Sequence, residues 1–217
     1  MNCRVEALCV GQPEIFRGEE LSAIGKHPVN GQVRITFTGL EGDAQADRVH
    51  HGGVDMAVHH YPHDHYAGWE EWLGGHELLS RPAAFGENIH AGGLTERDVC
   101  IGDRFRLGGA LLEVSQPRKP CWKIEHRFGR KGMLARILRS HICGWYYRVI
   151  EEGMAEAGDT LELIERRESD WPIARAFATL LDPTSAPDGE NLRALAALEA
   201  LSSDWRKKAA AKAENSG

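Results

Sequence analysis

Cys121 follows two prolines and two cations in the segment SQPRKPCWKI, which runs from residue 115 to residue 124. Proline fixes the backbone angle φ and removes a hydrogen-bond donor, so the two prolines are expected to hold the thiol in one direction. Neighbouring cations favour the thiolate, which is the form of cysteine that attacks electrophiles and binds metals. Cys121 is therefore a candidate metal ligand or nucleophile, and the alternative is a small buried side chain.

The segment that begins at this loop is strongly basic. Residues 118–139 hold eight of the 26 Lys and Arg residues of the chain but only one of its 32 Asp and Glu residues, Glu125. In a chain of net charge −6, such a cluster predicts a local anion site, for example for a phosphate group. A solvated helix face explains the charge equally well. The nearby Cys121 favours the anion site.

A second segment, DRVHHGGVDMAVHHYPHDHY, is rich in histidine. Its spacing does not favour zinc, because it lacks the H-E-x-x-H pattern and because His59 and His60 fall on opposite faces of a predicted strand. His51 precedes Gly52 and Gly53, and glycines allow a backbone to approach a ligand closely. A histidine there can donate to a phosphate or transfer a proton. A tight turn with an exposed histidine remains the alternative.

Asn88 lies in a third segment, AAFGENIHAGG, where it follows a glycine and a glutamate at the start of a predicted strand. An asparagine amide offers both a donor and an acceptor, which suits the edge of a heterocycle. Asparagine is also common in turns, so an Asn turn is the alternative interpretation.

Length and composition describe an ordinary globular chain of 217 residues, of which 42% are hydrophobic and 27% charged. The negative net charge argues against nucleic-acid polymers as partners, and no apolar run is long enough to span a membrane. The N-terminal residues have no long apolar run and no processing-site pattern, so no signal peptide is expected. Five scattered cysteines without a C-x-x-C pair argue against a zinc knuckle or an iron–sulfur cluster, and they predict a reducing, cytoplasmic location.

The elements that position these residues are predicted mainly as short strands between glycine-rich turns, which favours a barrel or a sandwich. Two helices are expected to interrupt the strands, at 62–73 and 131–141, because apolar residues recur there at helical spacing. The predicted strands cover Val5–Val10, Gln32–Thr38, Met56–His60, Glu87–His90, Asp103–Leu107, Ala110–Ser115, Trp145–Ile150 and Thr160–Glu165.

The composition changes after Arg167, where alanine, leucine and charged residues dominate. We therefore expect a first domain over residues 1–166 and a small domain of three helices over residues 167–217. Ser169 or Asp170 is predicted to cap the first of these helices, with Pro172 in its first turn. The last ten residues or so are expected to be frayed.

The segments GLEGDAQADRVHHGGVDMAVHHYPHDHY, FGENIHAGGLTERDVCIGDRFRLGGALLEVSQPRKPCWKI and GWYYRVIEEG together resemble MOSC-domain proteins. The name refers to the C-terminal domain of molybdenum-cofactor sulfurase. The match is with the YiiM-type subgroup, in which a three-helix domain often follows. This resemblance implies a mainly β protein with α-helices, namely a MOSC-type β-barrel with interspersed helices and a C-terminal three-helix domain.

The resemblance also implies a molybdenum cofactor, in which molybdenum is bound to a molybdopterin. Cys121 matches the cysteine that ligates the metal. The cofactor-site motifs of the subgroup map onto five further residues, which are His51, Gly52, Gly53, Asn88 and Arg118. Val54 and Met56 depart from the subgroup, which more often has a proline and a basic residue there, and this leaves substrate preference open.

YiiM-type proteins are implicated in reducing N-hydroxylated compounds, such as 6-N-hydroxylaminopurine, to amines. The resemblance therefore implies a reductase with Cys121 as a catalytic metal ligand, and we expect His51 to be the proton donor, because its ordinary pKa lies near neutrality. The chain has neither a G-x-G-x-x-G motif nor an iron–sulfur cysteine set. A separate electron donor is therefore expected, namely a flavin reductase.

Two alternatives remain open. In the first, Cys121 carries sulfur or the cofactor without catalysis, which also needs a cysteine in a basic pocket. In the second, Cys121 is the nucleophile of a hydrolase with His51 or His126 as its base. The proline-rich loop is not a nucleophile elbow, which argues against the hydrolase.

Overall fold

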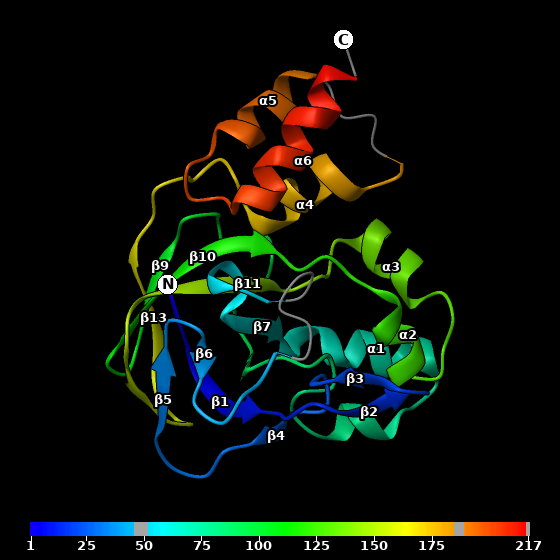
Figure 1. Cartoon of the computed structure of the whole chain (residues 1–217), viewed down its shortest axis with the longest axis vertical. Helices are drawn as coiled ribbons and strands as arrows, with labels where there is room; N and C mark the ends of the chain where they lie inside the picture. Colours follow the sequence, from blue (N-terminus) through cyan, green and yellow to red (C-terminus); the bar gives the residue numbers. More distant parts are fainter. Residues whose placement is uncertain (46–51, 185–188, 216–217) are drawn as a thin grey trace.

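The computed structural model describes residues 1–45, 52–184 and 189–215. Within these ranges, seven strands form a closed barrel, because the first and last strands of the ring pair with each other (Figure 1). The predicted barrel with interspersed helices is confirmed. In spatial order the strands are β13 (Thr160–Glu165), β9 (Arg104–Leu107), β10 (Ala110–Pro117), β11 (Trp145–Glu151), β7 (Val58–Pro62), β8 (Ile89–Ala91) and β1 (Asn2–Val10).

Strand β1 closes the ring by changing partners along its length. Its first residues pair with β13, its middle with β8 and its end with the short strand β4 (His27–Pro28). The register with β8 steps from Val5 opposite Ala91 to Ala7 opposite His90. Glu6 is therefore the extra residue of a β-bulge, a feature that bends a strand and redirects a side chain.

Besides β4, five of the described strands lie outside the ring. β5 (Val33–Thr36) was predicted as Gln32–Thr38, and it belongs to a separate small sheet rather than to the barrel. A hairpin of two strands lies on the other side of the molecule, close to α2 in Figure 1. These additional strands are β6 (Gly39–Leu40) and β12 (Gly153–Ala155), which flank β5, and β2 (Glu14–Arg17) and β3 (Glu20–Ser22), which form the hairpin.

Helices interrupt the strands in two places, as predicted. The first segment starts with a 3₁₀ turn at His63–His65 and continues as α1 (Tyr66–Leu73), whereas Pro62 still belongs to β7. The second is α3 (Met133–Ser140), which ends at His141 in the left-handed conformation. One helix was not predicted, namely α2 (Trp122–Arg127), which begins directly after Cys121.

The three C-terminal helices gather over one end of the barrel, and the predicted three-helix unit is confirmed (Figure 1). They are α4 (Ile173–Leu181), α5 (Gly189–Ala197) and α6 (Ser203–Glu214). The predicted cap was wrong, because Pro172 is the N-cap of α4 and no side chain accepts a hydrogen bond there. The expected fraying was also wrong, since α6 continues to Glu214.

The helices and the barrel share one apolar core, which includes Ile101, Phe105, Phe177, Leu195 and Trp205. Backbone bonds link the two parts as well, for example from the amide of residue 202 to the carbonyl of residue 115 at 2.9 Å. The domain boundary near residue 166 stays a prediction. Over the part of the chain that is described, none of the helices has the length and apolarity that a membrane span requires.

Two adjacent histidines of β7, His59 and His60, are buried. Burial lowers the pKa of His59 well below its ordinary value, and it lowers the pKa of His60 to about 3. Both rings are therefore neutral in the folded protein at pH 5, whereas they are protonated in the unfolded chain. The unfolded state then binds more protons, so stability falls as the pH drops below about 6.5.

We expect each of these histidines to lower the free energy of unfolding by about 2 kcal/mol between pH 7 and pH 5. Urea unfolding of the wild type and of His60→Phe across this range measures the effect. Between pH 7 and pH 5, the free energy of unfolding of His60→Phe should fall less than that of the wild type, by the contribution of one histidine. The exposed control His27→Ala should show the same fall as the wild type. An equal fall for His60→Phe and the wild type would contradict the account.

Candidate functional site

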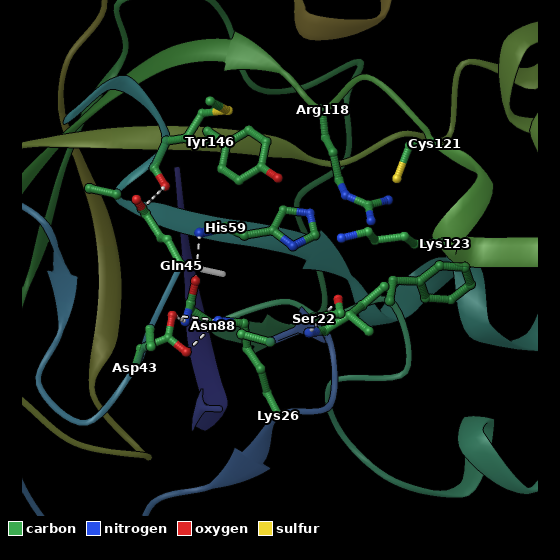
Figure 2. A pocket seen from close by; sticks show the side chains of 17 residues that line it. Ser22, Lys26, Asp43, Gln45, His59, Asn88, Arg118, Cys121, Lys123 and Tyr146 are labelled. Carbon is green, nitrogen blue, oxygen red and sulfur yellow. Dashed lines mark hydrogen bonds and ion pairs between the residues drawn. The ribbon is translucent and has the colours of Figure 1, made fainter. Parts of the chain in front are cut away.

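A pocket opens beside the barrel, between the β2–β3 hairpin, the end of β10 and the start of α2. Figure 2 shows its polar side chains, which come from segments far apart in the sequence. They are Ser22, Lys26, Asp43, Gln45, His59, Asn88, Arg118, Cys121, Lys123 and Tyr146.

Cys121 lies at the rim of this pocket as the N-cap residue of α2. It is half-buried, whereas the other four cysteines are buried, and all five are free thiols. Burial raises the pKa of Cys3 to about 11 and that of Cys9 to about 12, so both remain protonated at neutral pH. Among the five, Cys121 combines access to solvent with a place in the pocket.

Arg118 brings a buried positive charge to the same pocket, with only 7% of the residue exposed. It follows the end of β10, and its backbone amide donates to the carbonyl of Gly144 at 3.0 Å. Its positive charge acts on Tyr146, whose pKa it lowers. Among the residues that the structure describes, no carboxylate forms an ion pair with Arg118. A buried guanidinium without a counter-charge is costly, so this side of the pocket suits an anion.

His59 and Tyr146 are direct cross-strand neighbours on β7 and β11, and their ring centroids lie 5.0 Å apart. Burial and the charge of Arg118 lower the pKa of His59, so the imidazole is neutral. Its Nε2 atom is buried and has no hydrogen-bond partner in the described chain. Burial raises the pKa of Tyr146, an effect that Arg118 partly opposes, so the phenol keeps its proton at neutral pH.

Asn88 links three segments at the opposite wall of the pocket. Its side-chain oxygen accepts from the amide of His59 at 3.0 Å. Its nitrogen donates to the carbonyl of Cys9 at 3.0 Å and to the carboxylate of Asp43 at 2.8 Å. Both amide protons are thus used within the protein. Contact between Asn88 and a cofactor stays a prediction, and the structure shows a role in holding the wall together.

Asp43 is also committed to protein partners. It accepts from the amide of Gly11 at 2.8 Å and forms a short ion pair with Lys26. Burial lowers the pKa of Lys26, and the charge of Asp43 opposes this shift. This carboxylate is therefore not the counter-charge of Arg118.

The basic run of residues 118–139 divides into cations that line the pocket and cations that do not. Arg118 and Lys123 line it, and the ammonium of Lys123 lies 3.2 Å from the carboxylate of Glu20 in the hairpin. Arg127 instead donates to the carbonyl of Ala84 at 2.8 Å. The guanidiniums of Arg130 and Arg136 stack on tryptophan rings, and Lys119, Lys131 and Arg139 are exposed.

Three of the predicted site residues, Cys121, Arg118 and Asn88, are therefore brought to one pocket (Figure 2). His51 lies outside the described residues. Gly53 does not line the pocket, but its amide donates at 3.0 Å to Gln45, which does. The roles predicted for His51, Gly52 and Gly53 stay predictions.

Four residues of the pocket were not predicted from the sequence, namely Lys26, Asp43, His59 and Tyr146. For His59 and Tyr146 a signal existed, because HHYP and GWYYRV are strand patterns in which neighbouring residues face opposite sides. Lys26 and Asp43 lie in irregular segments, and nothing in the local sequence indicates that they pair.

Comparison with known proteins identifies the family. The MOSC domain model matches residues 47–162, and the model of the YiiM-like 3-alpha helix domain matches residues 171–214. The chain belongs to the MOSC-domain family. It is of the YiiM-like type, and the MOSC domain is associated with binding of the molybdenum cofactor.

Individual relatives agree with this assignment. Protein YiiM of Escherichia coli is 42% identical over 169 residues, which are 77% of this chain and 75% of that protein. A protein of Gibberella moniliformis named "Reductase" is 40% identical over 157 residues, which are 72% of this chain but only 28% of that longer protein. The crystal structure of YiiM from Geobacillus stearothermophilus superposes with a TM-score of 0.81 at 32% identity, covering 97% of this chain and 98% of that one.

Replacing Asn88 by aspartate tests its structural role. Asn88→Asp removes both donors and places a carboxylate oxygen against Asp43, so we expect the free energy of unfolding to fall by about 2–4 kcal/mol. Asn30→Asp, in an exposed loop, is the matched control and should change it by less than about 0.5 kcal/mol. Urea unfolding at pH 7 gives both values. If both variants lost the same small amount of unfolding free energy, the Asn88 amide would not be holding the pocket wall together.

Proposed function

We propose that this protein is a molybdenum-cofactor-dependent oxidoreductase that reduces N-hydroxylated compounds, such as 6-N-hydroxylaminopurine, to amines. The observation that carries the proposal is the pairing, in one pocket, of the half-buried thiol of Cys121 with the buried, carboxylate-free guanidinium of Arg118. Membership of the MOSC-domain family and the relative named as a reductase support it.

The residues of the pocket fit the cofactor in three respects. A thiolate is a soft ligand, as a thiophilic metal centre requires. A phosphate group of a pterin would supply the counter-charge for Arg118 (Figure 2). Lys123 lies next to Arg118 and would contact the same group. The buried Nε2 of His59 is an unused hydrogen-bonding atom for a polar edge of the same ligand.

The bound cofactor would supply the two-electron chemistry by which an N–OH group becomes N–H with release of water. The protein's own task is to bind, orient and deliver protons. Cys121 would ligate the metal, and Arg118 and Lys123 would hold the phosphate. Two protons are consumed for each amine formed, and their donor is His51 in this proposal. The phenol of Tyr146 is a second protonated group that lines the pocket, although burial makes it a weaker acid.

Electrons would come from a separate flavin reductase, because the sequence carries no nicotinamide or iron–sulfur motif of its own. The Gibberella moniliformis relative named as a reductase is much longer than this chain. The identity of the donor, the substrate and the cytoplasmic location all belong to the proposal.

A non-catalytic carrier of sulfur or cofactor would use the same thiol in the same basic pocket, and turnover distinguishes it from the enzyme. A cysteine hydrolase is less well supported. The Nε2 atom of His126 lies 2.9 Å from the carbonyl of Phe16, and this histidine does not line the pocket. The other candidate base, His51, lies outside the described residues.

Cys121→Ser should abolish reduction of 6-N-hydroxylaminopurine while the fold remains intact. A serine side chain has nearly the same shape, but its hydroxyl is not deprotonated at neutral pH and is a poor ligand for a soft metal. The assay couples purified protein, loaded with cofactor by its host, to a flavin reductase and follows amine formation. Molybdenum content and unfolding are measured on the same preparations.

Cys100→Ser is the matched control, because Cys100 is buried, does not line the pocket and donates its thiol to the carbonyl of Ser169 at 3.7 Å. It should keep wild-type turnover. Full turnover in Cys121→Ser would overturn the ligand role. Molybdenum bound to the wild type without any turnover would favour the carrier instead.

A further inference from the structure

A second constellation of possible ligands lies at β8, and none of its residues lines the pocket. The side chains of Glu6, His63 and His90 direct one ligand atom each to a common point, and these three atoms lie within 4.8 Å of one another. Glu6 comes from the bulge of β1, His90 from β8, and His63 from the 3₁₀ turn that follows β7. Since β8 lies between β1 and β7, the order of strands brings the three together.

The distances suit a bound metal ion. The Nδ1 atom of His63 lies 3.0 Å and the Nε2 atom of His90 lies 3.8 Å from the same oxygen of Glu6. A tetrahedral zinc ion with ligand bonds of about 2.0–2.2 Å separates its ligand atoms by about 3.3–3.6 Å. The observed separations lie on either side of this range, so small adjustments of the half-exposed Glu6 and His63 would complete the geometry.

The carboxylate of Glu87 orients the buried ligand, His90. Its Nδ1 atom lies 3.1 Å from the carboxylate of Glu87, which is fully buried. Glu87 also accepts from the hydroxyl of Tyr66 and from the amides of Ala83 and Phe85.

The Glu87 carboxylate accepts from these three donors, and it also acts as the acceptor toward His90. Nδ1 of His90 therefore carries the proton, and Nε2 presents its lone pair. That lone pair then faces an oxygen of Glu6, another acceptor, at 3.8 Å, and a bound cation would be shared by both. A carboxylate hydrogen-bonded to the far nitrogen of a histidine is also the usual support of a metal ligand.

We propose that Glu6, His63 and His90 bind one divalent transition-metal ion of the zinc class, with Glu87 as the positioning residue and solvent in the remaining coordination position. Two imidazoles and one carboxylate form a ligand set that suits such an ion and not calcium or magnesium, which prefer oxygen. The ion would connect β1, β8 and the start of α1 at the seam where the barrel closes. This site is independent of Cys121 and of the proposed reaction.

The test is zinc binding by the full chain after removal of metals with a chelator. Titration calorimetry and metal analysis after dialysis should give one zinc ion per wild-type chain, with a rise in Tm of about 5–10 °C at a hundredfold excess over Kd. His63→Ala and Glu6→Gln should lower affinity at least about tenfold. His27→Ala, an exposed histidine elsewhere, and Cys121→Ser should bind as the wild type does.

Cobalt is a second probe of the same site, because its visible absorption reports the ligand geometry. The band expected for a four-coordinate site should appear in the wild type and in Cys121→Ser, and it should be absent in His63→Ala. The proposal is overturned if the wild type takes up no zinc, or if His63→Ala and Glu6→Gln retain wild-type zinc affinity. Either result would leave only an ion pair between Glu6 and His63.

Discussion

The buried charge of Arg118 is the constraint around which the pocket is organised. A guanidinium removed from water requires a counter-charge or a set of acceptors. Asp43, the carboxylate among the described residues that line the pocket, is engaged by Lys26, Asn88 and Gly11 and does not meet this need. The protein thus retains an unneutralised cation next to its half-buried thiol, and an anionic ligand would supply the missing charge.

Alternation along the strands allows one barrel to serve several purposes. On β7, His59 faces the pocket while His60 packs against Trp145 and Tyr147, with ring centroids 4.4 and 6.2 Å away. Just before β8, Asn88 holds the pocket wall, while the preceding Glu87 orients His90 of the proposed metal site. On β7 the separation of His59 from His60 follows from the extended backbone, in which successive side chains point in opposite directions.

Much of this architecture was predictable from patterns of period two. TLELIE gave both ends of β13 correctly, and the strand predicted over Trp145–Ile150 is one residue shorter than β11. Other elements carry too little local signal. α2 has six residues, too few to show helical periodicity, and β5 reads like a barrel strand although its partners belong to another sheet.

For the pocket, the local sequence indicated Cys121 and Asn88, because their loops are stiff or glycine-rich. Arg118 was one cation of the basic run, and the resemblance to MOSC-domain proteins singled it out. The Lys26–Asp43 pair and the convergence of Glu6, His63 and His90 result from long-range strand order. Pairings of this kind depend on which strands become neighbours, and the local residue types do not show which strands those are. The histidine-rich segment was judged poor for zinc on its own spacing, and the proposed ligand set draws only one residue from it.

The central claim is that Arg118 and Cys121 form a site for an anionic molybdenum cofactor. The most direct test is the molybdenum and pterin content of protein purified from a host that makes this cofactor. Wild type should carry close to one molybdenum per chain, Arg118→Gln should lose most of it, and Arg139→Gln, which removes an exposed cation of the same basic segment, should retain it. Equal molybdenum in all three proteins, or none in the wild type, would contradict the account.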